Sequence, residues 1–127
     1  MSGPISDLGE LLRSLEVVVL PGIWQFTTQS IDDPVPKGAI MSFNEREGST
    51  IISPAGHDTP ESNKWTWVEV SVHSDLNAVG FLAKLAEALS AAGIPCNAIA
   101  GYYHDHIFVP VGMGTSAVSA LVTLKTE

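Results

Sequence analysis

The chain is poor in cysteine and in positive charge. Cys96 is its single cysteine, so no intrachain disulfide can form and a secreted, disulfide-held fold is excluded. Lys and Arg together number 6, against 14 Asp and Glu, which gives the 127 residues a net charge of −8. A surface this acidic repels a phosphate backbone, so we expect no nucleic-acid partner.

Long apolar runs and targeting signals are lacking as well. No uncharged apolar stretch approaches the roughly 20 residues of a membrane span. Residues 1–7 lack the basic start and apolar core of a signal peptide. We therefore expect a cytoplasmic protein without a membrane partner. Hydrophobic residues still make up 45% of the chain, enough for one core or two small docked modules.

Catalytic motifs are missing too. The chain has no Gly-x-Ser-x-Gly, no Cys-x-x-Cys, no dinucleotide fingerprint and no phosphate-binding loop with lysine. His104 and His106, with His73 elsewhere, raise a metal or acid–base site as an alternative. In a strand, however, His104 and His106 share a face while Asp105 points away. We therefore favour polar hairpin or ligand-pocket residues and expect no enzyme activity, no metal and no cofactor.

The first half combines one short helix with several strands. Asp7 and Glu10 have the spacing of a capping box, and the leucines that follow fall on one helical face. Those leucines are Leu8, Leu11, Leu12 and Leu15. β-Branched residues and turn signals then predict strands over 16–20, 23–27, 39–45 and 49–53.

The second half has a more regular pattern. Val68, Val70 and Val72 alternate along a strand. A helix is predicted over 77–92, with Gly93 as its C-terminal cap. Its expected buried stripe is Val79, Leu82, Leu85, Ala86 and Leu89. Strands over 94–100 and 106–111 follow, and Thr115 is expected to cap a last helix whose inward residues are Val118, Leu121 and Val122.

The order β-α-β-β-α is one strand short of a split βαβ sandwich. Residues 16–20 of the first half are the best candidate for the missing edge strand, with a partner chain as the alternative. We place the boundary between the two halves at residues 63 and 64, in a polar stretch. If the first half supplies the strand, cutting the chain near Gly56 should leave neither piece folded.

The second half resembles the ACT domain family, small regulatory modules of amino-acid metabolism. Three segments carry the resemblance: the strand 68–72, the helix start 77–82 and the turn 93–97. The hairpin over 103–110 looks like that of small tandem-ACT proteins related to the cytosolic arginine sensor. The family usually has Asp and Pro where this chain has Asn77 and Val79. The resemblance implies an α+β, ferredoxin-like (βαββαβ) sandwich of two ACT-like halves side by side: a degenerate half over 1–63 and an ACT domain over 64–127.

The same resemblance implies a binding site for an amino acid. Gly80 would let a carboxylate approach the free N–H groups of a helix start, or would merely allow close packing of the helix on the sheet. Asp105 would take the ammonium group, or would serve the geometry of a turn. The expected ligand-binding residues are Ser74, Asp75, Leu76, Asn77, Ala78, Val79, Gly80, Asn97, His104 and Asp105.

The expected function is therefore that of an amino-acid-binding regulatory or sensor protein, working as a homodimer. The alternative is an interaction or dimerisation module whose ligand pocket is vestigial. Trp24, Trp65 and Trp67 favour an interface, either between the halves or between two chains.

Overall fold

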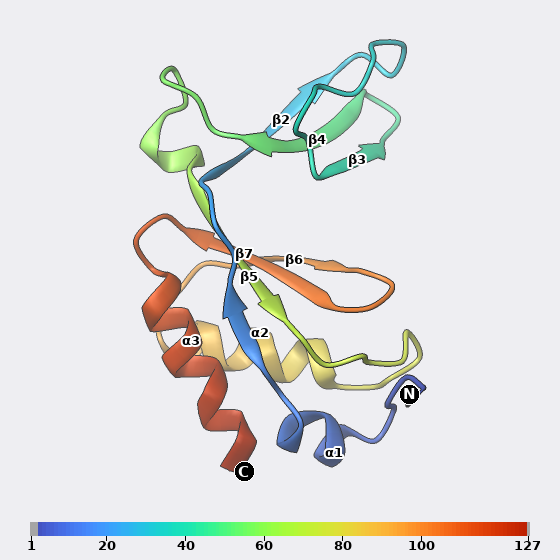
Figure 1. Cartoon of the computed structure of the whole chain (residues 1–127), viewed down its shortest axis with the longest axis vertical. Coiled ribbons are helices and arrows are strands. Elements are labelled where there is room, and N and C mark those ends of the chain that lie inside the picture. Colours follow the sequence, from blue (N-terminus) through green and yellow to red (C-terminus); the bar gives the residue numbers. More distant parts are fainter. Residues whose placement is uncertain (1–2, 127) are drawn as a thin grey trace.

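The structure, a computed structural model, describes residues 3–126 as two joined antiparallel sheets with helices on one side (Figure 1). The helical module has a sheet in the order β1-β5-β7-β6 and carries every α-helix of the described chain on one face. Its elements are α1 (Leu8–Arg13), β1 (Val17–Val19), β5 (Trp65–Val70), α2 (Phe81–Ala91), β6 (Asn97–Ala100), β7 (Asp105–Pro110), α3 (Gly114–Val122) and the 3₁₀ turn η2 (Thr123–Thr126).

The upper sheet consists of β2, β3 and β4 and carries no α-helix. Its strands are β2 (Trp24–Gln29), β3 (Met41–Asn44) and β4 (Ser49–Pro54), in the order β3-β4-β2. It joins the helical module through β2 and β5, which are paired in register only at Trp24 and Trp65 among the described residues. The two sheets thus form one continuous, curled antiparallel sheet, and the expected α+β fold of two ACT-like halves is confirmed.

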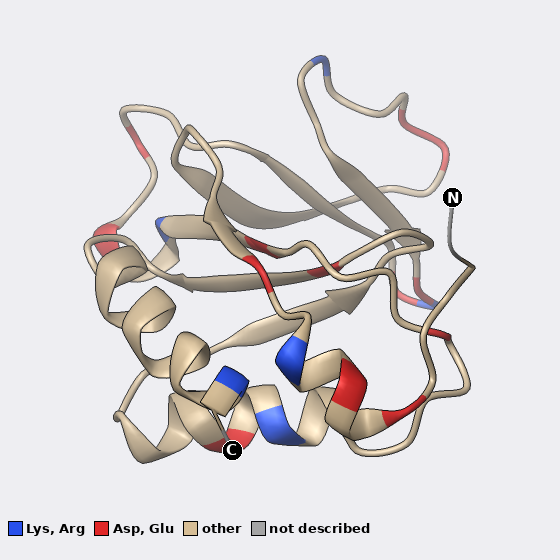
Figure 2. Ribbon diagram, turned by 60° about the horizontal axis from the view of Figure 1, so that its bottom comes forward, with Lys and Arg blue, Asp and Glu red and all other residues tan. Residues whose placement is uncertain are grey.

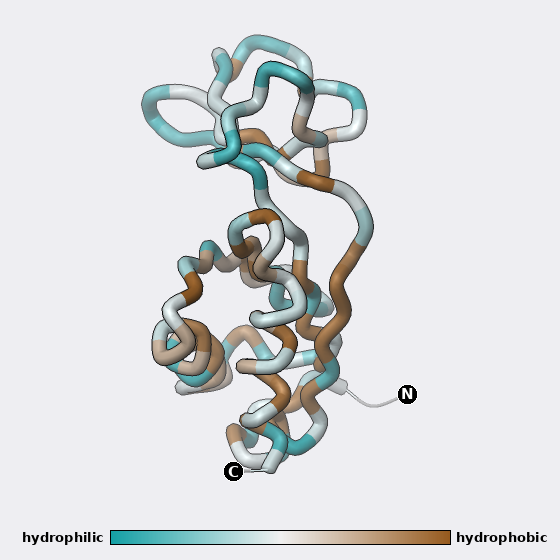
Figure 3. Tube along the Cα trace, turned by 90° about the vertical axis from the view of Figure 1, so that its left-hand side faces the viewer, coloured by the Kyte–Doolittle hydropathy of each residue, from teal (hydrophilic) through white to brown (hydrophobic). Residues whose placement is uncertain are grey.

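The apolar core lies under the helical module. Leu11 of α1 and Leu15, just after its end, both have no exposed surface and join the same cluster as Leu85 of α2 and Leu121 of α3. Figure 3 shows the hydrophobic segments concentrated in this half and along the strand that leaves it, whereas the loops of the upper sheet are mostly hydrophilic. The leucine face predicted for the first helix is therefore the face that builds the core of the second half.

The missing edge strand comes from the first half. β1 pairs antiparallel with β5, and Val17, Val18 and Val19 lie opposite Val70, Glu69 and Val68. Pro21 and Gly22 then break the strand, with Gly22 at φ +99°, a backbone conformation that L-residues avoid. One stretch of chain consequently serves both sheets, as an edge in the helical module and as β2 in the upper sheet.

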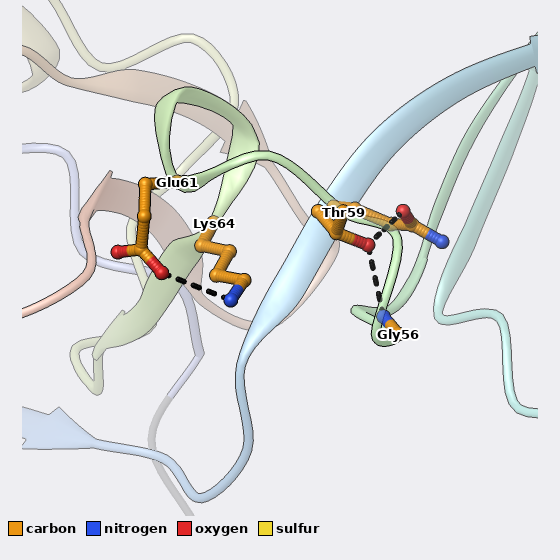
Figure 4. Close-up of polar contacts among 5 residues, drawn as sticks. Gly56, Thr59, Glu61 and Lys64 are labelled. Carbon is orange, nitrogen blue, oxygen red and sulfur yellow. Dashed lines mark hydrogen bonds and ion pairs between the residues drawn. The ribbon is translucent and has the colours of Figure 1, made fainter.

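Side-chain hydrogen bonds order the connection between the two sheets. Thr59, only 8% exposed, accepts from the Gly56 N–H at 2.9 Å and donates to Gln25 Oε1 at 2.7 Å (Figure 4). Asn63, at the end of the 3₁₀ turn η1 (Glu61–Asn63), accepts from the N–H of Phe26 at 3.1 Å and donates to its carbonyl at 2.9 Å. The Asn63 amide thus binds the β2 backbone as a neighbouring strand would.

Two helix boundaries differ from the prediction. α2 begins at Phe81, not at residue 77, so its buried residues are Phe81, Leu85 and Leu89, while Val79 is 85% exposed and Leu82 48%. Gly93 does cap its end: it adopts φ +73° and donates to the carbonyl of Ser90. α3 already begins at Gly114, so no residue caps it with a side chain and Thr115 lies inside the helix.

That earlier start also changes which face of α3 is buried. Its buried residues are Gly114, Ala117 and Leu121, and Val122, predicted to face inward, is 40% exposed. Gly114 packs against Thr66 and Val19, where a Cβ would meet Thr66 Cγ2 at 3.1 Å. Close contact with the sheet therefore fixes where the helix begins. No helix in the described chain is long and apolar enough to cross a membrane.

Candidate functional site

Most of the predicted binding residues lie in or beside the 73–80 loop, which joins the end of β5 to the start of α2. The N-terminal segment holds this loop in place: Ile5 donates to the carbonyl of His73 and accepts from the N–H of Asp75, both at 2.8 Å. Asp75 in turn accepts from the N–H of Asn77 at 2.9 Å, which closes an Asx turn. The loop is thus a hydrogen-bonded structure whose position depends on the N-terminal segment of the chain.

Asp105 is the buried charge of this region. The sequence placed it in the hairpin turn, but it is the first residue of β7, paired with Val70 of β5 and Ala100 of β6. Its side chain is 7% exposed and accepts a hydrogen bond from Ser74 Oγ at 3.1 Å. Burial raises the pKa of this carboxyl, while the Ser74 hydroxyl and the nearby histidines partly oppose the rise.

The start of α2 lies beside this carboxyl. Gly80 is its N-cap at φ +91°, and no side chain caps the first turn. A Cβ at Gly80 would meet Leu8 Cδ2 at 3.4 Å, an ordinary contact, so backbone conformation rather than close packing requires glycine here. The N–H groups of the first helical turn are left for water or a ligand.

Two cavities of similar size lie against the loop. The helix-side cavity, of about 210 Å³, is bounded by the loop, the first turn of α2, and strands β6 and β7. Its lining residues include Ser74, Asp75, Leu76, Ala78, Phe81, Leu82, Ala100 and Asp105. A second cavity, of about 220 Å³, lies between residues 73–77, Pro4 and Tyr102.

The structure therefore brings together five of the predicted residues in the helix-side cavity: Ser74, Asp75, Leu76, Ala78 and Asp105. Asn77 lines the second cavity. Val79 is almost fully exposed, and Gly80 acts through its backbone. Asn97 lies at the opposite end of β6 from Ala100, is exposed and pairs with Phe108 on the other face of the sheet. It does not join the cavity.

His104 lies outside the helix-side cavity, in the turn between β6 and β7. Its carbonyl accepts from the Gly101 N–H at 2.9 Å, and its ring centroid lies 6.4 Å from that of His106. Its Nδ1 is buried without a hydrogen-bond partner among the described residues. Within residues 3–126 no three His, Cys, Asp or Glu side chains are arranged to hold a metal ion.

Sequence reasoning missed part of the lining of both cavities. Leu82 was assigned to the core face of a longer helix, Phe81 was given no role in a site, and Ala100 was treated only as part of a strand. Pro4 and Tyr102 line the second cavity because Ile5 bridges to Ser74 and the hairpin folds back toward the loop. Only the Asp75–Asn77 spacing, typical of an Asx turn, could have indicated the later start of α2.

The family models for ACT domains match this chain twice. One ACT domain model covers residues 64–123 and a second covers residues 3–57. The chain therefore belongs to the ACT domain family, and it is a tandem ACT domain protein. Neither matched model describes a catalytic domain. ACT domains are typically regulatory modules that bind small molecules. None of the curated proteins matches the chain in sequence.

Solved structures show the same arrangement. A Vibrio cholerae protein of unknown function, described as a possible transport protein, is 33% identical, with 93% of this chain and 95% of that chain covered and a TM-score of 0.79. The ligand-free regulatory subunit of aspartate kinase from Thermus thermophilus is 11% identical, with a TM-score of 0.59 over 86% of this chain and 97% of that one. Aspartokinase α and β subunits give 9% identity and a TM-score of 0.61, covering 87% of this chain and 97% of that chain. At these low identities the last two show the fold alone.

Proposed function

We propose that this protein binds a small amino acid reversibly in the helix-side cavity and acts as a regulatory sensor without catalytic activity. The observation that carries the proposal is Asp105, a buried carboxyl that lines a cavity beside an uncapped helix start. In the described chain its side chain receives one hydrogen bond, from Ser74. A carboxylate buried with so few partners is stabilised when a cation is placed against it.

A zwitterion supplies the two charges that this arrangement favours. Its ammonium group would lie against Asp105, and its carboxylate would accept from the N–H groups of the first turn of α2. The helix dipole contributes about 0.3–1 kcal/mol to such a contact. Acidic residues outnumber basic ones by 14 to 6, and Figure 2 shows acidic segments spread over the strands and loops as well as on the helices. A ligand with no net charge is therefore favoured over an anion.

The size and lining of the cavity favour a small aliphatic side chain. An apolar cavity of about 150 Å³ accommodates benzene, so about 210 Å³ corresponds to roughly eight or nine non-hydrogen atoms. Phe81, Leu82 and Ala100 would contact the side chain of the ligand. The resemblance of the hairpin to the arginine-sensor group makes arginine a further candidate, and the same screen tests it.

A thermal-shift screen of the twenty amino acids tests the proposal. One of them, at about 100 times its dissociation constant, should stabilise the protein by ~2.7 kcal/mol, which corresponds to a rise in Tm of roughly 10 °C. Asp105→Asn should abolish the rise, because the ammonium then loses its counter-charge. The matched control Asp58→Asn lies outside the cavity and should retain it. If no amino acid raises Tm, or if Asp105→Asn responds as the wild type does, the proposal fails.

Asp105→Asn should also change how the stability of the ligand-free protein depends on pH. Because burial raises the pKa of Asp105 in the folded state, ionisation is less favourable there than in the unfolded chain. The stability that the neutral carboxyl contributes is present below its unfolded pKa and is lost as pH rises through the folded pKa. The variant has no such loss. At pH 7 it should therefore be more stable than the wild type, by on the order of 1 kcal/mol, the usual cost of an underpaired buried polar group.

Urea unfolding at pH 4 and pH 7 measures this difference, with Asp58→Asn again as the control. The gap between Asp105→Asn and the wild type should widen toward pH 7. A variant that is less stable than the wild type at pH 7 would show that ionised Asp105 already has enough partners without a ligand.

A docking or dimerisation role is the second candidate, and exposed apolar side chains near the loop favour it. Leu76 is 69% exposed and Val79 85%, and Tyr102 and Tyr103 of the adjacent hairpin are 72% and 64% exposed. Covering such a surface with a second chain is favourable, which supports the expected homodimer. Sedimentation equilibrium separates the two roles: a stable dimer that no amino acid stabilises favours docking.

The single cysteine is compatible with the reducing cytoplasm, where we expect the protein to work.

A further inference from the structure

A third cavity lies on the opposite face of the sheet from Asp105. It has a volume of about 230 Å³ and opens between the upper sheet and the face of the helical module that the helices leave uncovered. Ile40, Met41 and Ile52 form its upper wall, and Trp67 and Phe108 form its floor. The halves of the tandem thus create a hollow that neither sheet has alone.

The floor is aromatic. Trp67 and Phe108 lie opposite each other on β5 and β7, with ring planes at 20° and centroids 6.1 Å apart. Phe108 is 1% exposed and supports the floor from within, whereas Trp67 is half-buried and presents the accessible ring. A flat ring stacks favourably on such an indole, and the aliphatic side chains of the opposite wall add apolar contact. The shape and the apolar lining therefore favour a flat aromatic molecule.

One polar group faces this apolar space. Trp67 Nε1–H donates to His106 Nδ1 at 3.0 Å, so Nδ1 carries no proton and the hydrogen of the neutral imidazole is on Nε2. His106 Nε2 lies beside Gly101, where a Cβ would be only 3.1 Å away, and both residues line the cavity. The absence of a side chain at Gly101 leaves this N–H accessible to a ligand.

The charge around the cavity selects against ions. Burial lowers the pKa of His106, against the opposing effect of Glu69, so the ring is a neutral donor. Glu69 lies opposite His106 on β5, and its carboxylate accepts from Ser71 Oγ at 2.7 Å. A neutral donor with a carboxylate as its neighbour favours an uncharged hydrogen-bond acceptor over an anion.

From these observations we infer that the cavity between the halves binds a neutral, flat heteroaromatic molecule whose ring nitrogen or oxygen accepts from His106 Nε2. By comparison with the 150 Å³ that benzene fills, the volume suits roughly nine non-hydrogen atoms, which is a bicyclic ring system. This site is separate from the proposed amino-acid site, because His106 and Asp105 are neighbours on β7 and point to opposite faces of the sheet.

Quinoline is the probe that tests the inference, with naphthalene as its counterpart without an acceptor. Nuclear magnetic resonance can follow the indole N–H of Trp67, assigned among the three tryptophans by single Trp→Phe variants. Quinoline should shift this signal saturably and bind about 3- to 10-fold more tightly than naphthalene, the ratio expected for one net hydrogen bond. In His106→Phe, which keeps a ring but removes the donor, the preference should vanish.

The variant Ile99→Trp should fill the cavity with a larger side chain, because Ile99 of β6 lines the cavity and is half-buried. The matched control is Val122→Trp, an exposed position on α3, which covers the other face of the sheet, outside the lining. Quinoline binding should be lost in Ile99→Trp and kept in Val122→Trp.

Three results would overturn the inference. They are no binding of quinoline to the wild type, equal binding when the cavity is plugged, and equally tight binding of naphthalene. Sedimentation run in parallel tests whether a second chain covers the cavity. If it does, the wild type is a dimer, Ile99→Trp dissociates it, and quinoline fails to bind the wild type. Because Asp105→Asn leaves this cavity unchanged, it should bind quinoline normally even if the amino-acid screen is negative.

Discussion

A fragment that starts at residue 57 should not fold by itself, although it contains the whole range, 64–123, that one ACT domain model matches. Expressed alone, residues 57–127 should give a poorly dispersed amide spectrum and no cooperative unfolding transition. The piece that ends at residue 56 should behave in the same way, since the leucines of α1 would have no core to join. The cut falls beside Gly56, between β4 and β5.

The reason lies in what the cut removes from the helical module. The fragment loses β1, so β5 exposes its unpaired edge. It also loses Leu11, Leu12 and Leu15, which are 0%, 7% and 0% exposed in the intact chain. Burying a leucine contributes about 1.5–3 kcal/mol, so these three account for roughly 5–9 kcal/mol. A domain of this size is stable by only about 5–15 kcal/mol, and the loss is of the same order.

Complementation provides the matched control. A peptide of residues 3–20 contains both α1 and β1, so adding it to the 57–127 fragment should restore the dispersed spectrum. The same peptide with Leu11→Asp and Leu15→Asp should restore nothing, because it cannot enter the core. A 57–127 fragment that unfolds cooperatively without any peptide would contradict the shared core.

Much of this fold could be predicted because its local signals agree with its packing. The leucine face of the first helix and the valine strand of the second half are periodic over several residues, and both are buried as expected. Counting strands showed that one edge was missing, and the β-branched run over 16–20 was the best candidate, with a partner chain as the alternative. β1 confirms that assignment. The boundary between the two halves at residues 63 and 64 stays a prediction.

Local patterns failed where distant contacts decide the structure. Residues 77–80 continue a helical pattern, but the Asx turn at Asp75 and the positive φ of Gly80 delay the helix to Phe81. Asp105 looks like a turn residue in its own neighbourhood, yet pairing with β5 and β6 places it in a strand and buries it. Its partner Ser74 lies 31 residues away in the sequence.

The site was therefore only partly predictable. The resemblance to ACT domains selected the 73–80 loop and Asp105, whose proximity the structure establishes. The cavity between the halves had no sequence signal of its own. Its walls meet because the chain turns at Pro21 and Gly22 and the sheet curls. The pattern of apolar and polar residues in a strand does not show in which direction a sheet curls. Trp24 and Trp67, whose rings lie 5.3 Å apart, were the one indication that this face is covered.

Phe108→Ala should destabilise the protein by about 3–5 kcal/mol, the usual cost of removing a buried aromatic ring. Phe108 is 1% exposed on β7, and its ring meets Phe26 of the upper sheet edge-on at 5.5 Å and Trp67 at 6.1 Å. The two sheets are paired in register at a single residue pair, Trp24 with Trp65, so aromatic packing must supply much of the contact between them. Loss of this ring should weaken the junction first.

Urea unfolding followed by two signals can show this order of events. Tryptophan fluorescence reports on the junction, where all three tryptophans lie on β2 and β5, and circular dichroism at 222 nm reports mainly on the helices. Both signals should share one midpoint in the wild type, whereas in Phe108→Ala the fluorescence midpoint should fall below that of the helices. Phe43→Ala is the matched control, since Phe43 is 63% exposed on β3 and should cost no more than about 0.5 kcal/mol. If Phe108→Ala costs as little as Phe43→Ala, the hydrogen bonds of Asn63 and Thr59, rather than the aromatic cluster, hold the halves together.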